Sequence, residues 1–385
     1  MFHALFNSLS GLFSFSKSLD TVSNNVANMN TPGFRGSDSF FENVNGGRGT
    51  RIGGDGVRTT PGDIRQTSTP TDLAIDGNGY FILRDAQGRH YYSRAGQFRF
   101  DGNGLLIDTA TGYEVMAIDA QGNLQAIDLD DHRMLQPQGT SVVRMTGNIV
   151  PGAATTSVGS IQIYDATGGM HTLTATLTDN STVTAGSYLV SVVDETGAIV
   201  GTGEVRFATD GTPVATFNAL TLNLSYGGVA QTVELNFGTP GAFDGAMRLT
   251  GIAASLKAQA PDGHPLLGVS SLSFDDDGVL QLVYSSAEKR KGPQIALATF
   301  PSDSTLEMVG GRLVAGTSVA GREIGRPGSG GLGRIAGSSL EMSNVDLNQE
   351  FADMIIIQRG YQASSRVMTV SNEMIEQLYN STRGG

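Results

Sequence analysis

The sequence predicts a mainly β protein with α-helical termini, in which discontinuous β domains are nested between an N-terminal and a C-terminal helix that pair as a coiled coil. Glycine contributes 52 of the 385 residues, well above the usual share of about 7%. Through the middle of the chain, short apolar runs alternate with Gly, Asp and Asn turns at intervals of about 8–12 residues, as in β sandwiches and barrels. Both ends instead space their apolar residues as helices do.

The N-terminal helix is expected from Phe2 to about Met29, where Pro32-Gly33 ends it. One stripe of this helix steps alternately by four and three residues, which is the spacing of a heptad repeat. It consists of Leu5, Leu9, Leu12, Ser16, Leu19, Ser23 and Val26. The two serines make the stripe weaker than that of a stable isolated coiled coil.

The C-terminal helix shows the same spacing over a longer stretch. Its stripe consists of Leu347, Phe351, Met354, Gln358, Tyr361, Ser365, Met368, Asn372, Ile375 and Tyr379. Asn344 or Ser343 is the expected N-cap, and Asp346 and Glu350 lie near the positive end of the helix dipole.

The region between the helices is expected to be β structure. The expected strands are Tyr80–Leu83, Tyr113–Ile118, Ile161–Tyr164, Tyr188–Val193, Ala219–Tyr226, Thr232–Phe237, Leu280–Tyr284 and Ile295–Phe300. Asp-Gly-Asn-Gly and Asp-Ala-Gln-Gly each occur twice and supply residues that tolerate the positive φ of tight turns. Gly46–Gly62 and Gly321–Gly333 have the composition of linkers.

The predicted layout is therefore nested. The terminal helices take 1–30 and 341–385, and an extended linker takes 31–70. A β-rich body is expected over 71–145 plus 251–335, and an inserted outer β domain over 146–250.

The composition excludes several classes of function. A net charge of −12 with only 25 basic residues does not suit nucleic-acid binding, which needs clustered Lys and Arg. The absence of cysteine excludes disulfides, zinc–thiolate sites and thiol catalysis. No segment reaches the roughly 18 consecutive apolar residues of a membrane span. We expect no nucleic-acid partner and no insertion into a membrane.

Patterns for catalysis or metal binding are weak. The histidines are scattered, at His3, His90, His132, His171 and His264. Asp275–Asp277 with Gly278 resembles the start of a calcium loop, but the required Glu would fall on Tyr284. Gly328, Gly330 and Gly333 form GxGxxG without the strand that a nucleotide site needs in front of it. We expect no enzyme activity, no cofactor and no metal ion.

Motifs at both ends resemble the bacterial flagellar rod and hook protein family. Near the N-terminus, Ser23–Asn28 (SNNVAN) precedes Thr31–Arg35 (TPGFR). Near the C-terminus, Leu340–Leu347 (LEMSNVDL) precedes Gln358–Ala363 (QRGYQA). Each of these four stretches resembles a signature of the family.

The body carries further resemblances. Asp72–Phe81 and Ser93–Phe98 resemble the family's first body strand and the segment after it. Ile161–Gly168, followed by His171, and Ile295–Phe300 resemble strands of the longer hook members. The resemblance covers essentially the whole chain and favours a hook member over the shorter rod members.

The resemblance implies a structural, self-assembling axial protein: a subunit of the flagellar hook, the curved tube that acts as a universal joint between rod and filament. The terminal helices would form the inner coiled-coil layer, the body the middle layer and the insert the outer layer. The alternatives are a distal-rod or hook-associated axial protein and, from a different class, an extracellular β-rich adhesin.

The resemblance also implies partners and location. The chain would polymerise with itself and contact the distal rod protein, the hook cap, the hook–filament junction proteins and the flagellar type III export apparatus. It would reach the extracellular hook and basal body without a cleaved signal peptide. Phe2 and Phe6 resemble the family's export signal, although both residues could equally pack within the helix.

The expected polymer interface lies on the terminal helices. It comprises Leu5, Leu9, Leu12, Leu19, Asn24, Asn25, Val26, Asn28, Leu347, Phe351, Met354, Tyr361, Met368 and Ile375. The simpler alternative is that the two helices pack only on each other or on their own β body.

Overall fold

The computed structural model describes residues 2–44, 49–301, 306–309, 313–316 and 321–383. The chain forms two compact units. The first contains Met1–Arg133 and Ser270–Gly385, and the second contains Met134–Val269.

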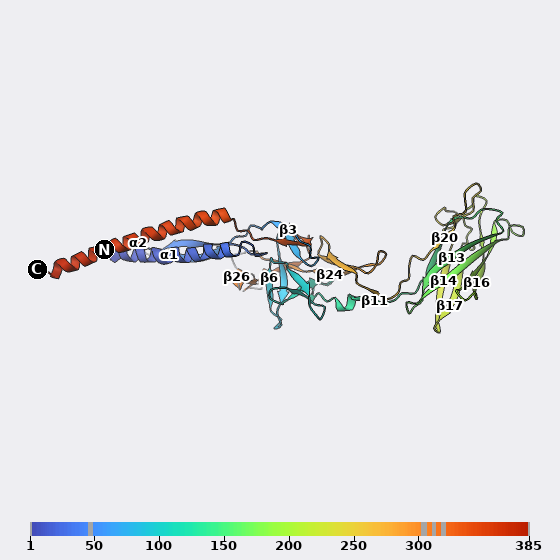
Figure 1. The fold of residues 1–385 in the computed structure, drawn as a ribbon, viewed down its shortest axis with the longest axis horizontal. Coiled ribbons are helices and arrows are strands. Elements are labelled where there is room, and N and C mark those ends of the chain that lie inside the picture. Colours follow the sequence, from blue (N-terminus) through green and yellow to red (C-terminus); the bar gives the residue numbers. More distant parts are fainter. Residues whose placement is uncertain (1, 45–48, 302–305, 310–312, 317–320, 384–385) are drawn as a thin grey trace. The chain divides into compact units, whose positions relative to one another are not determined.

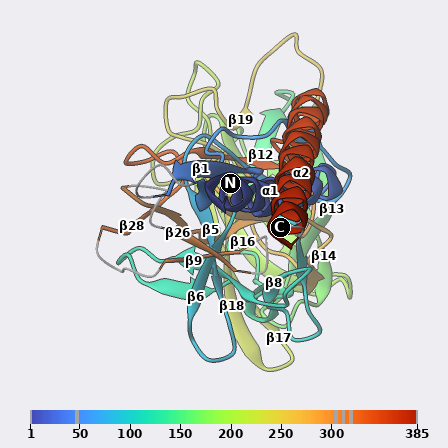
Figure 2. The same cartoon turned by 90° about the vertical axis from the view of Figure 1, so that its left-hand side faces the viewer.

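Two long helices form one end of the first unit. Helix α1 spans Phe2–Ala27 and helix α2 spans Leu347–Arg383, so the sequence predicted both helices correctly. They pack as an antiparallel pair with the two chain ends at the same end of the pair (Figures 1 and 2). Neither described helix combines the length and apolarity required to cross a membrane.

A β-hairpin lies against α1. Strands β1 (Ser37–Asn43) and β2 (Thr50–Val57) pair antiparallel, with a bulge between Phe40 and Phe41. The sequence predicts an extended linker over 31–70, because Gly46–Gly62 within it has many glycines and no apolar period. The strands form nevertheless, because their pairing bonds and α1 supply the support that the local sequence lacks.

The β body of the first unit is built by two segments of the chain. The outgoing segment contains β3 Ile64–Gln66, β4 Leu73–Asp76, β5 Tyr80–Arg84, β6 His90–Ser93, β7 Phe98–Phe100, β8 Leu106–Asp108, β9 Glu114–Ile118, β10 Leu124–Ala126 and the 3-10 turn η1 Asp130–His132. The returning segment contains β22 Ser271–Phe274, β23 Val279–Val283, β24 Lys289–Ile295, β25 Leu297–Thr299, β26 Leu306–Val309, β27 Leu313–Gly316, β28 Glu323–Gly325, β29 Arg334–Gly337 and β30 Ser339–Glu341.

The two segments share one sheet. The central path of the described strands runs β22-β23-β24-β9-β5-β6-β27-β26, so the returning β24 pairs with the outgoing β9. Smaller pairs, β29 with β4 and β3 with β30, bring the chain back to the start of α2. The body is therefore one structural unit made from two separate stretches of sequence. The chain enters it after α1 and leaves it before α2 on strands that pair with each other.

The second unit is a β sandwich. Its strands are β11 Met134–Leu135, β12 Val142–Asn148, β13 Thr155–Tyr164, β14 Met170–Asp179, β15 Ser187–Val193, β16 Ile199–Arg206, β17 Ala219–Tyr226, β18 Val229–Asn236, β19 Ala246–Met247, β20 Lys257–Gln259 and β21 Leu267–Gly268. Strands β13-β14-β15-β16 form one sheet, and β17-β18-β12-β19 with β20 form the other. Alternating residues of both sheets, such as Ile163, Leu177, Leu222 and Leu235, share one buried core.

The Asp/Gly motifs form the tight turns that the sequence predicts. In Asp85–Gly88 the carboxylate oxygen Oδ1 of Asp85 accepts hydrogen bonds from the backbone N–H groups of Gln87 and Arg89, at 3.0 and 2.8 Å. Gly88 has φ +81°, which glycine adopts without strain. Asp275 accepts in the same way from Asp277 and Val279, so this acidic run is a strand connection.

The fold class predicted from the sequence, mainly β with helical termini, is confirmed. The nested domain boundaries stay a prediction.

Candidate functional site: an assembly surface on the terminal helices

Helix α1 contacts the rest of its chain mainly through small and polar side chains. Its buried residues are Ser8, Gly11, Ser14, Ser18, Val22 and Asn25. The Ser14 hydroxyl donates to the carbonyl of Thr50 at 3.1 Å, and the Thr21 and Ser39 hydroxyls lie 2.8 Å apart. The Ser8 hydroxyl likewise donates to the carbonyl of Leu5 at 2.8 Å, so these two buried hydroxyls, Ser8 and Ser14, have the partners that burial of a polar group requires. The stripe that packs inward is not the leucine stripe.

The α1–α2 contact is also made by small residues. A Cβ atom on Gly11 would lie 2.9 Å from the Ser364 hydroxyl oxygen, and one on Gly360 would lie 2.5 Å from the Phe15 ring. The two helix axes can therefore approach more closely than leucine side chains would allow.

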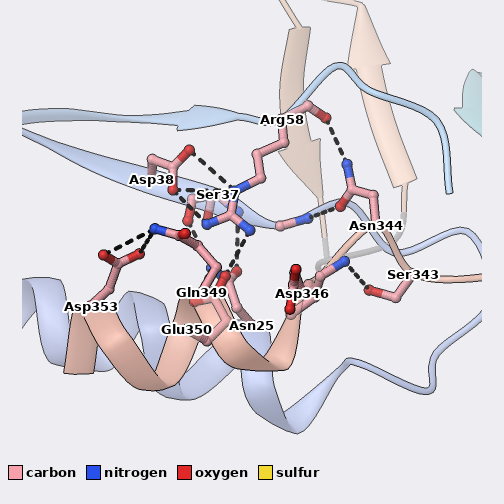
Figure 3. Close-up of polar contacts among 12 residues, drawn as sticks. Asn25, Ser37, Asp38, Arg58, Ser343, Asn344, Asp346, Gln349, Glu350 and Asp353 are labelled. Carbon is pink, nitrogen blue, oxygen red and sulfur yellow. Dashed lines mark hydrogen bonds and ion pairs between the residues drawn. The ribbon is translucent and has the colours of Figure 1, made fainter. Parts of the chain in front are cut away.

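A polar cluster joins α1, the hairpin and α2 where all three meet (Figure 3). Glu350 of α2 is fully buried. One of its carboxylate oxygens lies 2.7 Å from Nη1 of Arg58, and the other accepts from the Asn25 amide at 3.1 Å. Asn25 also donates to the Ser37 carbonyl at 2.8 Å and accepts from the Ser37 N–H at 3.0 Å.

Arg58 is held between two carboxylates. Its Nη2 lies 2.7 Å from Asp38, on the hairpin, while its Nη1 reaches Glu350 on α2. The hydrogen bond to Asp38 raises the pKa of Arg58 above its usual value, and the contact with Glu350 adds to this. Arg58 is therefore charged at every physiological pH and can neutralise the buried carboxylate.

The start of α2 is fixed by further polar contacts. The Asp346 carboxylate accepts from the N–H of Asn348 at 2.8 Å, so Asp346 is the N-cap, in place of the expected Asn344 or Ser343. Asn344 instead bonds the segment after α1, accepting from Gly36 at 2.8 Å and donating to the Thr60 carbonyl at 2.8 Å. The sequence could not separate these candidates, because all of them are good capping residues.

A second buried cluster fastens the returning chain to the body. Glu341, on β30, forms ion pairs with Arg94 at 2.7 Å and Arg35 at 3.4 Å. Arg94 also donates to the carbonyls of Gly77 and Gly79. Burial lowers the pKa of Arg94 and the neighbouring Glu341 opposes that shift.

Large apolar side chains remain exposed on the outward faces of both helices. On α1 these are Phe6, Leu9 and Phe13. On α2 they are Phe351, Ile355, Ile356, Tyr361, Val367, Met368, Val370, Met374, Leu378 and Tyr379. So many exposed large apolar side chains on two adjacent helices indicate a site of protein–protein interaction.

Apolar grooves run along the same pair of helices. One, of about 310 Å³, is lined by residues that include Phe15, Leu19, Ile357 and Tyr361. A second, of about 480 Å³, lies near the chain ends and is lined by Ala4, Arg366, Val367, Val370, Ser371 and Met374. Leu19 and Tyr361, both expected at the interface, thus meet in one groove.

The structure sorts the expected interface residues by exposure. Leu9, Asn24, Phe351, Tyr361 and Met368 are exposed. Half-buried are Leu5, Leu12, Leu19, Val26, Asn28, Leu347, Met354 and Ile375. Asn25 differs from the others, because it is fully buried in contacts within its own chain.

Sequence reasoning missed Phe13, Ile355, Ile356, Val370 and Met374, all of which are exposed. A single heptad stripe per helix cannot include them, because they lie beside it. The missed signal was the spacing of the small residues of α1, which marks the face that packs inward. Phe6, from the expected export signal, is 61% exposed, whereas the side chain of Phe2 lies outside the described residues.

Comparisons with known proteins agree along the chain. Residues 5–35 match the family "Flagella basal body rod protein", residues 74–165 match "Flagellar hook protein FlgE/F/G D1 domain" and residues 336–381 match "Flagellar basal body rod FlgEFG protein C-terminal". The N- and C-terminal matches cover most of α1 and nearly all of α2.

Two relatives that match over nearly the whole chain are flagellar hook proteins. The flagellar hook protein FlgE of Brucella suis is 30% identical over 97% of this chain and 98% of its own length. FlgE of Borreliella burgdorferi is 28% identical over 98% of this chain and 99% of its own length. The crystal structure of the Helicobacter pylori flagellar hook protein FlgE2 shares the fold, with a TM-score of 0.54 and 14% identity over 72% of this chain and all of that one.

Proposed function

Because the chain belongs to the bacterial flagellar hook protein family, we propose that it is a structural subunit of the hook and polymerises through the outward faces of α1 and α2. The observation that carries this proposal is how side chains are distributed on the terminal helices. Most buried residues of α1 are small or polar, and many large apolar residues of both helices are exposed.

Burial of these helix faces in an assembly is energetically favourable. Ile355 and Ile356 are 59% and 65% exposed, and Phe13 is 69% exposed. Burying such a side chain fully contributes about 1.5–3 kcal/mol. In a polymer, every copy that joins would bury these side chains and gain this free energy of burial. The gain offsets the entropy that each copy loses on association.

We further propose that this surface forms the inner layer of the tube. In this arrangement the helices of 1–30 and 341–385 lie innermost, the body of 71–145 and 251–335 in the middle and the insert of 146–250 outside. The pairing of β24 with β9 supports treating the two body segments as one layer.

The function is mechanical, and no catalytic turnover is expected. The whole-length hook relatives favour this reading over a distal-rod protein or an adhesin. The proposed partners are other copies of the chain, the distal rod protein, the hook cap, the hook–filament junction proteins and the export apparatus. The exposed side chain of Phe6 is accessible, as a residue of an export signal would need to be.

The test is genetic and visual. The gene is deleted in the parent organism and basal bodies are imaged by electron microscopy, with and without the full-length chain supplied in trans. We expect rods that end without a hook, and hooks restored by the full chain but not by a chain lacking Leu347–Tyr379. Hooks that persist without the gene, or intact polymers from the truncated chain, would contradict the proposal.

A further inference from the structure

The α1–α2 contact is made largely by small residues, although the large Phe15 ring lies over Gly360. Gly11 faces Ser364 and Gly360 faces Phe15, while Ser8 and Ser371 are also buried on the pair. Helices stay in register because large side chains of one insert into holes of the other. Small residues allow close approach but provide shallow knobs, so they hold the axial position only weakly.

A shift of α2 by one helical turn in one direction would place Gly360 opposite Gly11, so small residues would again face small residues. The reverse shift would place the larger Met368 opposite Gly11 and is disfavoured by size. The small-residue face therefore permits one axial register besides the observed one, and another contact must select between the two.

The polar cluster at the junction is able to make that selection. Glu350 is 0% exposed, and its two oxygens are used by Arg58 and Asn25. The shift that places Gly360 opposite Gly11 would bring Asp346 to the place of Glu350, with a carboxylate held on a side chain one methylene shorter. The reverse shift would bring Met354 there and leave Arg58 without this carboxylate. Both shifts disturb a buried ion pair, which is unfavourable.

We propose that Arg58, Asn25 and Glu350 form a register key. These positioning residues fix the axial register of α2 against α1 and the hairpin, and thereby the spacing of the apolar side chains that the pair presents to neighbouring copies. The second part rests on the proposed function. Buried polar groups are best attested in this role of selecting register, and they need not add stability.

The chain contains no cysteine, so introduced cysteine pairs can report the register directly. A Cβ on Gly11 would lie 3.6 Å from the Cβ of Ser364, within the range that a disulfide needs. Gly11→Cys with Ser364→Cys therefore reports the observed register. Ser8→Cys with Ser364→Cys, one turn away on α1, reports a slipped register.

Both cysteine pairs are placed in the full-length chain with three backgrounds. The first is otherwise unchanged, and the second replaces the key by apolar residues (Arg58→Met, Asn25→Leu, Glu350→Leu). The third is a matched control that removes the exposed hairpin ion pair (Arg51→Met, Glu42→Leu), whose side chains are 70% and 52% exposed. Helix content is followed by circular dichroism, and crosslinking by gel mobility after mild oxidation.

We expect the unchanged and control chains to form the Gly11–Ser364 crosslink and little of the slipped one. The apolar-key chain should keep its helix content, lose part of the native crosslink and gain the slipped one. A crosslink pattern like that of the unchanged chain, at the same helix content, would overturn the proposal.

Arg58→Lys is a milder variant for use if the three apolar substitutions unfold the helices. Lys keeps the charge but not the fork that reaches Asp38 and Glu350 together. We expect the slipped crosslink to increase in this chain too, and its absence would overturn the register key. These crosslinks are measured within the purified chain and do not require polymer formation. The register key can therefore fail or hold independently of the proposed function, which the polymer assays test.

Discussion

Arg94 and Glu341 form a buried ion pair, with Nε of Arg94 2.7 Å from Oε2 of Glu341 and both side chains 2% exposed. Arg94 lies in the outgoing part of the body, and Glu341 ends the strand that leads to α2. The pair connects segments that are 247 residues apart in the chain. The terminal helix is thus anchored to the body by electrostatics as well as by strand pairing.

Arg94→Ala should therefore destabilise the first unit strongly. It leaves the Glu341 carboxylate buried without its closest partner, which costs about 3–5 kcal/mol. Urea unfolding of the full chain, followed by circular dichroism, measures the loss. Arg51→Ala, which removes an exposed pair with Glu42, should cost at most about 1 kcal/mol. Equal small losses for the two variants would contradict the anchoring role.

Gly33→Ala should be much more damaging than Gly112→Ala. Both glycines have positive φ, +70° and +73°, so alanine pays a similar backbone cost of about 1–2 kcal/mol at each. Only at Gly33 would the added Cβ collide with backbone, 2.3 Å from the N of Ala95, whereas Gly112 has open space. The midpoints of urea unfolding for the two variants measure the difference. Similar midpoints would show that the turn after α1 does not need its close packing against the body.

Asp346→Ala should weaken the start of α2. It removes the acceptor for the N–H of Asn348 and costs about 1 kcal/mol. Ser343→Ala is the matched control, because the Ser343 hydroxyl lies outside the helix and accepts only a 3.3 Å bond from Val345. Thermal melting of the helical signal measures both. A larger loss of helix stability in Ser343→Ala than in Asp346→Ala would contradict this assignment and identify Ser343 as the N-cap.

The contribution of His171 to the stability of the second unit should decrease as pH rises. Burial lowers the pKa of His171, but hydrogen bonds to Asp165 at 3.0 Å and Glu195 at 3.2 Å outweigh it, so the pKa is raised above 6.5. The folded state thus binds the proton more tightly than the unfolded chain does. Its contribution is fully present below about pH 6.5 and is lost as pH rises through the folded pKa.

An NMR titration of the His171 ring gives the folded pKa, and unfolding at several pH values gives the stability. We expect the unchanged chain to lose stability as pH rises above about 6.5, and we expect His171→Gln to lose this pH dependence. A titration midpoint below that of a free histidine would contradict the assignment. Asp165 acts in the opposite direction, because hydrogen bonds from Thr167 and His171 lower its pKa, so its contribution disappears only in strong acid.

The helices and the β class could be predicted because their signals are local. Heptad spacing located both helices, and turns such as Asp85–Gly88 bring their own hydrogen bonds. The hairpin of β1 and β2 could not be predicted, since its support comes from pairing and from α1 rather than from its own residues.

The candidate site was predictable only in outline. Leucine spacing indicated helices that pair, but not which face meets which partner. The face that packs within the chain is marked by Ser8, Gly11 and Ser18, which apolarity patterns do not highlight. Likewise, nothing local to Arg58 or Glu350 announces a contact between residues so far apart in sequence.

The central claim is that the outward faces of the terminal helices drive polymerisation. Ile355→Ser with Ile356→Ser removes two exposed apolar side chains from α2, and Leu189→Ser with Ile199→Ser removes two from the second unit as a matched control. Sedimentation and electron microscopy of the purified chains measure polymer formation, with circular dichroism confirming that each remains folded. We expect the α2 variant to stay monomeric while the control polymerises like the unchanged chain. Normal polymers from the folded α2 variant would contradict the account.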